Sequence, residues 1–226
     1  MRSTLGLVAS AAMILGPLLA SLRVVPAMGG FVPFALGGVV ALVVAVVSLI
    51  QAVRGRGLTA GGALALLASV VFVAAAVHGG GVPLINDYTT DLRDPPTFRH
   101  AGNLPGNAGR DLAYPPAFAP IQQACCADLQ PIRLPVPPAE AFARVERVAR
   151  SESRWTITNT DPQAGTLEAV ATSRLFGFHD DIVVRIRPDG NAASVIDVRS
   201  KSRDGKGDRG VNADRIRAFA AALKRG

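Results

Sequence analysis

FGFHDDIVVRIRPDGNAASVIDVRS, residues 176–200, alternates apolar and charged side chains in two runs on either side of Pro188-Asp189-Gly190. This period of two predicts two β-strands, and the turn residues between them predict an antiparallel hairpin. The apolar residues of both strands share one face only if the residues paired across the hairpin are both even-numbered or both odd-numbered. A three- or five-residue loop allows this pairing, and a two-residue loop does not. The opposite, solvent-facing side would then carry a charged ladder of Asp181, Arg185, Arg187, Asp197 and Arg199.

The segments around this hairpin predict the other elements of one small domain, residues 131–226. Expected are a strand at Ile132–Val136, a helix at Pro138–Ser151, strands around Trp155–Ile157 and Leu167–Ala171, and a last helix at Val211–Lys224. The order βαββββα predicts an α+β domain in which an antiparallel sheet carries one or both helices on its apolar face. The topology is comparable with helix-grip folds, as an analogy of arrangement alone.

The first 81 residues differ sharply from the rest in composition. They contain no Asp or Glu, so all 17 acidic residues of the chain follow Gly81. Leu5–Leu22, Phe31–Ile50 and Leu58–Val77 are uncharged and apolar on all sides, and each has the roughly 20 residues needed to cross a bilayer as a helix. We therefore expect a membrane domain, residues 1–81, with three transmembrane helices.

One alternative is that the first apolar run is a cleaved signal peptide, since it follows Met1-Arg2. The run is long for such a peptide, lacks a clear A-x-A site and is followed by two further spans. Burial of the runs inside a soluble domain is less compatible with helices that are apolar all round.

The arginines near the helix ends predict the orientation. Arg54 and Arg56 place the loop between the second and third helices in the cytoplasm. Arg2 is consistent with the cytoplasmic amino terminus that follows from this orientation, whereas Arg23, in the first loop, is not. Everything after Val77 then lies on the outer side. In a bacterium with two membranes the protein would be a multi-pass inner (plasma) membrane protein of the cell envelope with a periplasmic domain.

Residues 82–130 have little periodicity and many turn formers, which predicts an irregular connecting segment. The chain has a formal net charge of +7, and its basic excess outside the membrane part is concentrated after Arg199. This local positive charge suits phosphate groups or anionic lipid headgroups.

Two motifs resemble the bacterial domain-of-unknown-function family 1499. Phe176 to Ile216 fits F-G-F-x-D-D-x-x-V-R-I followed by R-S-x-S-R-x-G-x-x-D-x-G-x-N-x-x-R-I. Pro83 to Phe98 fits P-x-I-x-D-x-T-T-D-x-x-x-P-P-x-F, which longer, membrane-anchored members place between their helices and the domain. The resemblance implies a fold unit and a connecting segment that lies along the domain. It implies no reaction, because the family has no assigned activity.

The polar residues of these motifs form the candidate ligand site. A glycine-rich loop, residues 199–217, enters the last helix with arginines nearby, which is compatible with an anion cradle. The alternative is a capped structural turn in which Asp208 and Arg203 neutralise each other. The candidate ligand-binding residues are Asp180, Asp181, Arg185, Asp197, Arg199, Ser200, Ser202, Arg203, Asp208, Asn212 and Arg215.

Other chemistry has weaker support. His179, Asp180 and Asp181 carry metal-ligating atoms, but neighbouring strand residues point to opposite faces, so no metal site is predicted. Cys125-Cys126 are the only cysteines, and free or intermolecularly paired thiols are expected because a vicinal disulfide ring is strained. No nucleotide-binding, nucleophile-elbow or zinc motif is present, and no cofactor is predicted.

Two functions remain open. The preferred hypothesis is a non-enzymatic, membrane-anchored envelope protein whose outer domain binds an anionic ligand or an envelope protein. The alternative is an enzyme acting on phosphate-bearing or lipid substrates through Asp180 or Asp181, with Arg199 and Arg203 as an electrostatic clamp. Membrane lipids are expected partners of the helices. Nucleic acid is not an expected partner, because the domain would lie outside the cytoplasm and few aromatic residues accompany the arginines.

Overall fold

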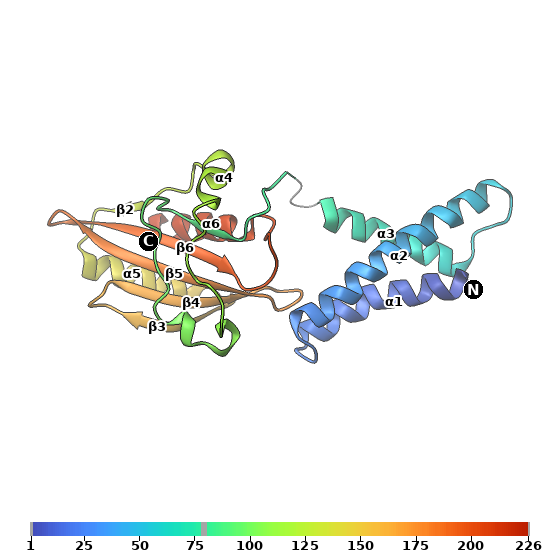
Figure 1. Cartoon of the computed structure of the whole chain (residues 1–226), viewed down its shortest axis with the longest axis horizontal. Coiled ribbons are helices and arrows are strands. Elements are labelled where there is room, and N and C mark those ends of the chain that lie inside the picture. The colour runs from blue at the N-terminus through green and yellow to red at the C-terminus, as the bar shows by residue number, and fades with distance from the viewer. Residues whose placement is uncertain (1, 78–80, 226) are drawn as a thin grey trace. The chain divides into compact units, whose positions relative to one another are not determined.

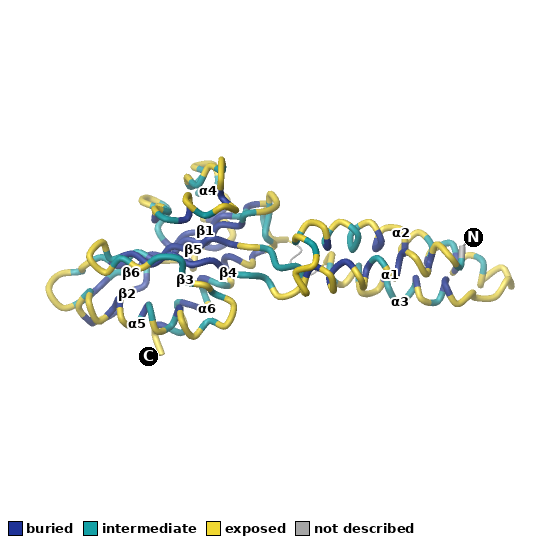
Figure 2. The backbone as a smooth tube through the Cα atoms, turned by 90° about the horizontal axis from the view of Figure 1, so that it is seen from below, coloured by how far each residue is buried: buried dark blue, intermediate teal, exposed yellow. Residues whose placement is uncertain are grey.

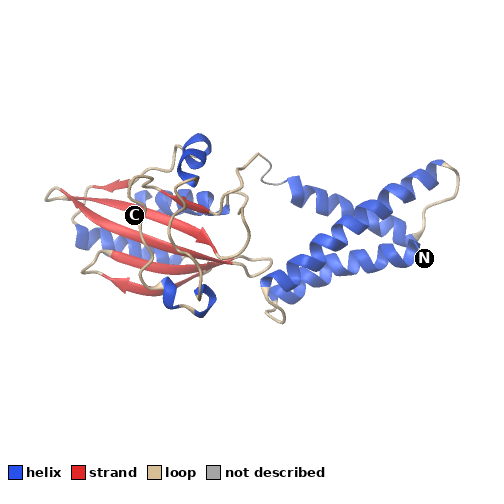
Figure 3. Cartoon of the chain, viewed as in Figure 1, coloured by secondary structure: helices blue, strands red, loops and turns tan. Residues whose placement is uncertain are grey.

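The computed structural model describes residues 2–77 and 81–225. It divides into two compact units, each treated separately below. The first comprises Met1–Gly80 with Ser173–Gly177, and the second Gly81–Thr172 with Phe178–Gly226. The helices of the first unit and the sheet of the second are drawn in Figures 1 and 3.

The three apolar runs form the predicted helices. These are α1 (Arg2–Ser21), α2 (Ala27–Val53) and α3 (Ala60–Val77). Each is long and apolar enough to cross a membrane. Most large apolar side chains of the helices are exposed, whereas glycine, alanine and serine occupy much of the space between the helices. This inside-out distribution is typical of helices that pack in lipid.

α1 and α3 approach each other backbone to backbone at Gly6 and Gly61. A Cβ added at Gly61 would overlap the backbone of Ser3, and one added at Gly6 would overlap the Gly61 carbonyl. The close approach of α1 and α3 therefore requires glycine, which has no side chain, at both positions.

The second unit is built on an antiparallel sheet with the strand order β1-β6-β5-β4-β3, in which β2 also pairs with β6. The predicted hairpin is confirmed. Its loop has three residues, and the even-numbered pairs Val184–Val198 and Ile186–Ile196 face each other. The strands are β1 (Asp87–Thr89), β2 (Ile132–Leu134), β3 (Trp155–Asp161), β4 (Thr166–Thr172), β5 (His179–Asp189) and β6 (Ala193–Ser202).

The helices α5 (Pro138–Ser151) and α6 (Val211–Arg225) cover the apolar face of the sheet, as predicted (Figure 2). Phe142 and Val145 of α5 and Ile216 and Phe219 of α6 join the even-numbered apolar residues of β5 and β6 and the odd-numbered ones of β4 in one core. The predicted βαββββα order from β2 to α6 is thus confirmed.

The other face of the sheet is not open to solvent, which corrects the prediction of an exposed charged ladder. Asp181 and Asp197 are 0% exposed and Arg199 is 1% exposed. The chain between β1 and β2, residues 90–131, crosses this face and is called the crossing segment below (Figures 1 and 2). It contains three short helices that the sequence did not reveal: η1 (Ala101–Asn103), η2 (Pro105–Asn107) and α4 (Phe118–Cys125).

Candidate functional site

Arg199 is the centre of the charged face. Its guanidinium makes two hydrogen bonds to Asp87 of β1, at 2.9 and 2.7 Å, and donates to the carbonyl oxygens of Pro96 and Leu112. It also lies over the ring of Phe98, with its Cζ atom 4.8 Å from the ring centroid. Two of these four hydrogen bonds go to β1 and two to the crossing segment, so Arg199 holds both against the sheet. Because it is only 1% exposed, it is not available to a ligand.

Glu168 of β4 fastens the same segment at a second point. Its carboxylate accepts three backbone hydrogen bonds from Arg99, His100 and Ala101, at 2.6, 2.9 and 2.7 Å. The side chain is 1% exposed. A buried carboxylate with three donors is fully hydrogen-bonded and serves as an anchor for the start of η1.

Asp181 forms the third anchor. It accepts hydrogen bonds from Arg203, with a shortest distance of 2.7 Å, and from the side-chain amide of Asn107 at 3.0 Å. Asn107 in turn accepts a hydrogen bond from Arg110, whose guanidinium lies 3.7 Å from the Asp181 carboxylate. Arg203 therefore pairs with Asp181 and not, as the capped-turn alternative held, with Asp208.

Asp197 lies between two arginines of β5. Its Oδ2 atom accepts hydrogen bonds from Arg185 at 3.0 Å and from Arg187 at 2.9 Å. Both arginines also reach Asp91 in the crossing segment, and Arg185 reaches Asp94. The second carboxylate oxygen, Oδ1, is buried and has no hydrogen-bond partner within residues 2–77 and 81–225.

The remaining candidate residues lie on the opposite face, at the start of α6. Asp180 pairs with Arg215 at 2.6 Å, and Asn212 links the hydroxyl groups of Ser200 and Ser202 at 2.6 and 2.8 Å. These contacts join the ends of β5 and β6 to the first turns of the helix. The eleven candidate residues consequently do not converge on one site.

Asp208 caps α6. Its carboxylate accepts hydrogen bonds from the backbone N–H groups of Gly210 and Asn212, at 2.9 and 2.7 Å. Burial raises the pKa of Asp208, and the two backbone hydrogen bonds act against that shift. Because this carboxylate accepts from two N–H groups at the start of the helix, these two donors are not available to an external anion.

The residues of the enzymatic alternative are all engaged in internal pairs. Asp180 and Asp181 point to opposite faces of β5 and bind different arginines, so they do not form a joint acid–base pair. Within the described residues, no group of three His, Cys, Asp or Glu side chains has the arrangement of a metal site.

Cys125 and Cys126 form a disulfide at the end of α4, which corrects the expectation of free or intermolecularly paired thiols. Cys126 leaves the helix with φ −143° and ψ 41°, and this departure from helical geometry accompanies the bond between neighbours.

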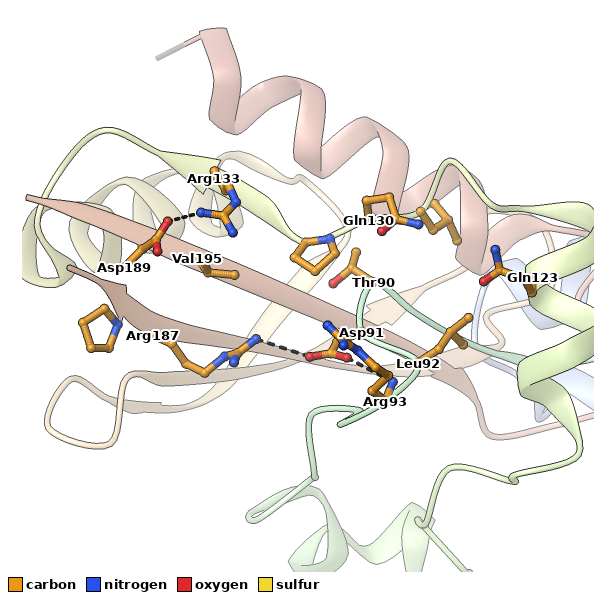
Figure 4. Close-up of a pocket in the computed structure, with 13 residues that line it drawn as sticks. Thr90, Asp91, Leu92, Arg93, Gln123, Gln130, Arg133, Arg187, Asp189 and Val195 are labelled. Atoms are coloured by element: carbon orange, nitrogen blue, oxygen red, sulfur yellow. Dashed lines mark hydrogen bonds and ion pairs between the residues drawn. The ribbon is translucent and has the colours of Figure 1, made fainter.

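A cavity of about 590 Å³ lies beside the charged face and contains three arginines (Figure 4). The crossing segment contributes Asp91 and Arg93, the hairpin contributes Arg187 and Asp189, and β2 contributes Arg133. We call this cavity the arginine groove. Arg187 could be predicted as part of the ladder from the alternation along its strand, whereas no motif marks Arg93 or Arg133 and neither was predicted.

The arginines of the groove differ in how they are engaged. Arg187 is held by Asp197 and, at 3.3 Å, by Asp91, yet 43% of its side chain remains exposed. Arg133 pairs with Asp189, and both side chains are substantially exposed. The Arg93 guanidinium is exposed and has no hydrogen bond or ion pair with any residue that the structure describes. The groove can therefore offer planar, charged donors to a carboxylate or a phosphate.

Residues 87–223 match the model of a family described as protein of unknown function (DUF1499). The matched span begins at Asp87, the partner of Arg199, and ends at Leu223 in the core of α6. It includes the crossing segment as well as the sheet. No curated protein matches the chain.

Proposed function

We propose that this chain, which belongs to the DUF1499 family, is a membrane-anchored, non-enzymatic binding module on the outer side of the inner membrane of a bacterium. Its ligand is an anionic group of a small molecule or of an envelope protein, bound in the arginine groove. The observation that carries this proposal is the 590 Å³ cavity that is lined by three arginines, of which Arg93 has no ion partner among the described residues.

The charge balance of the groove favours an anion over a cation. Three arginines face two carboxylates, and Asp91 is already engaged by Arg185, Arg187 and the backbone N–H groups of Arg93 and Asp94. Arg133 and Asp189 form an exposed pair, which contributes about 0 to 1 kcal/mol and is easily exchanged for a better partner. An incoming carboxylate or phosphate would thus have to break only this weak pair in order to bind.

Binding is tested with the full-length protein in nanodiscs of zwitterionic lipid. Inorganic phosphate and a small dicarboxylate are titrated, with a neutral polyol as reference, and the thermal midpoint is followed because a ligand that binds only the native state raises it. We expect the apparent affinity to fall at least about tenfold in Arg93→Gln and Arg133→Gln. Arg147→Gln, on the exposed side of α5, is the matched control. Equal responses of the three variants, or no response to either anion, would exclude the groove as the site.

The outer location is supported by Arg54 and Arg56, which follow α2 directly. Alkaline phosphatase and a fluorescent protein that folds only in the cytoplasm are fused separately to the carboxyl terminus. Phosphatase activity without fluorescence is the expected result. Fluorescence without phosphatase activity would place the domain in the cytoplasm and remove envelope components as ligands.

A further inference from the structure

An apolar and basic surface lies at the end of the sheet where the chain enters the second unit. Val82, Leu84 and Val211 are 37%, 74% and 48% exposed, although each is a large apolar side chain. Lys206 and Arg209 are exposed beside them, in the loop between β6 and α6. We call these five residues the entry surface.

The entry surface is ordered by contacts between its two segments. Asn86 donates a hydrogen bond to the carbonyl oxygen of Gly205 at 2.7 Å, and the N–H of Asp208 donates to the carbonyl oxygen of Ile85 at 3.2 Å. A Cβ on Gly207 would overlap the Leu84 side chain, and one on Gly210 would lie 3.4 Å from Val82. Val82 and Leu84 are thus held against the loop that carries the two basic residues and leads into Val211.

The length of the chain keeps this surface near the membrane. α3, the last of the three apolar helices, ends at Val77, and Val82 follows five residues later. A fully extended chain of five residues spans at most about 18 Å. This limit holds for any orientation of the domain. It places Val82 within reach of the headgroup region, which is roughly 5 to 8 Å deep on each side of the hydrocarbon core.

We propose that the entry surface binds the anionic phospholipid headgroups of the membrane that the helices cross. Exposed valine and leucine side chains would enter the boundary between headgroups and acyl chains, while Lys206 and Arg209 would lie at the level of the phosphates. Interfacial protein surfaces commonly place apolar and basic side chains in this way. The acidic residues of the loop do not cancel this charge completely: Asp208 is engaged in the cap of α6, which leaves Asp204 as the exposed carboxylate of the loop.

This inference does not depend on the arginine groove, which lies at the other end of the sheet. Ser202, beside the entry surface, lies seven positions along β6 from Val195 in the groove. At about 3.3 Å per residue this is roughly 23 Å. A domain that rests on the bilayer by its entry surface would hold the groove away from the membrane, open to ligands in the surrounding compartment.

The test uses the full-length protein in bilayers that contain dibrominated lipid, which quenches a nearby tryptophan. Trp155→Phe removes the native tryptophan and keeps an aromatic ring stacked on Phe219. Leu84→Trp and, separately, Val211→Trp then report from the entry surface, and Asn191→Trp reports from the hairpin loop at the far end. The bilayers are either zwitterionic or contain roughly one third phosphatidylglycerol.

We expect quenching of the tryptophans at positions 84 and 211 to be at least about twofold stronger in the anionic bilayer, and to weaken in about 0.5 M salt. Lys206→Gln with Arg209→Gln should abolish that difference, whereas Arg147→Gln with Lys224→Gln, the same loss of charge elsewhere, should not. Quenching that is equal in the two bilayers, absent from both, or unaffected by the Lys206 and Arg209 changes overturns the proposal. The proposal is also overturned if the tryptophan at position 191 is quenched as strongly as those at positions 84 and 211.

Discussion

Arg199 of β6 and Asp87 of β1 are 112 residues apart in the chain and form a buried ion pair with two hydrogen bonds, at 2.9 and 2.7 Å. Lys201 reaches the same carboxylate at 3.0 Å. Asp87 begins β1, at the end of the segment that leads from the apolar helices onto the sheet. The pair therefore fixes the point at which that segment becomes part of the domain.

Replacing Asp87 with asparagine should destabilise the domain by about 3 to 5 kcal/mol, because Arg199 and Lys201 would remain buried without a counter-ion. Chemical denaturation of the intact protein in detergent measures the change. Asp189→Asn is the control, since it breaks the exposed pair with Arg133 and should cost no more than about 1 kcal/mol. Similar losses in the two variants would mean that the Asp87 pair is not a major anchor.

Glu168→Gln should release the start of η1. The amide group can accept at one end only, so at least one of the three N–H donors at residues 99–101 loses its acceptor, at a cost of about 1 to 3 kcal/mol. Amide hydrogen exchange should be faster at one or more of these three residues. Glu152→Gln, a change of the same kind at a carboxylate with no hydrogen bond among the described residues, should leave their exchange unchanged. Unchanged protection in both variants would contradict this assignment.

The hydrophobic pattern was sufficient to predict the apolar helices and the βαββββα core. Val184 and Val198 could be paired correctly because one-residue slips would put apolar residues on the wrong face, and this constraint is local to the hairpin. β1 escaped prediction because Asp87–Thr89 lies in a segment rich in turn formers and shows no alternation of apolar and polar residues. It is a strand because Tyr88 pairs with Ser200 of β6, far away in the sequence.

The polar residues were harder to interpret because burial of a charge depends on a distant partner. The alternation along the hairpin predicted that Asp181, Asp197, Arg185 and Arg199 belong to one charged ladder on a solvent-facing side. Only the pair of Asp197 with Arg185 forms, and Asp181 instead meets Arg203 while Arg199 meets Asp87. The crossing segment supplies partners for these charged side chains and covers them from solvent. Its own sequence has no periodicity that would predict which face of the sheet it packs on.

Tyr88 should make the domain sensitive to alkali. Burial, with a further contribution from Asp208, raises the pKa of Tyr88 from 10.0 to about 12. Between these values the unfolded state releases its proton before the native state does, so the free energy of unfolding falls as pH rises, by roughly 2 to 3 kcal/mol in total. Below pH 10 this contribution is constant.

The variant Tyr88→Phe isolates the effect. The Tyr88 hydroxyl is buried and has no hydrogen-bond partner among the described residues, so its removal should change the stability at pH 8 by no more than about 1 kcal/mol. From pH 10 to 12 the variant should lose less stability than the wild type, as measured by denaturant titration at each pH. Tyr114, whose pKa is also raised by burial, remains in both proteins and accounts for part of the residual slope. Parallel pH profiles would show that Tyr88 ionises as readily in the native state as in the unfolded one.

Gly61→Val should loosen the membrane bundle, because the new side chain would occupy the space of the Ser3 backbone at the crossing of α1 and α3. Overpacking of this kind costs about 1 to 3 kcal/mol. Helix content followed during titration with sodium dodecyl sulfate measures the stability of the bundle in micelles. Ala74→Val adds a branched side chain on the exposed side of the same helix and should shift the midpoint little. If the two substitutions shift the midpoint equally, α1 and α3 do not meet at Gly6 and Gly61 in the membrane.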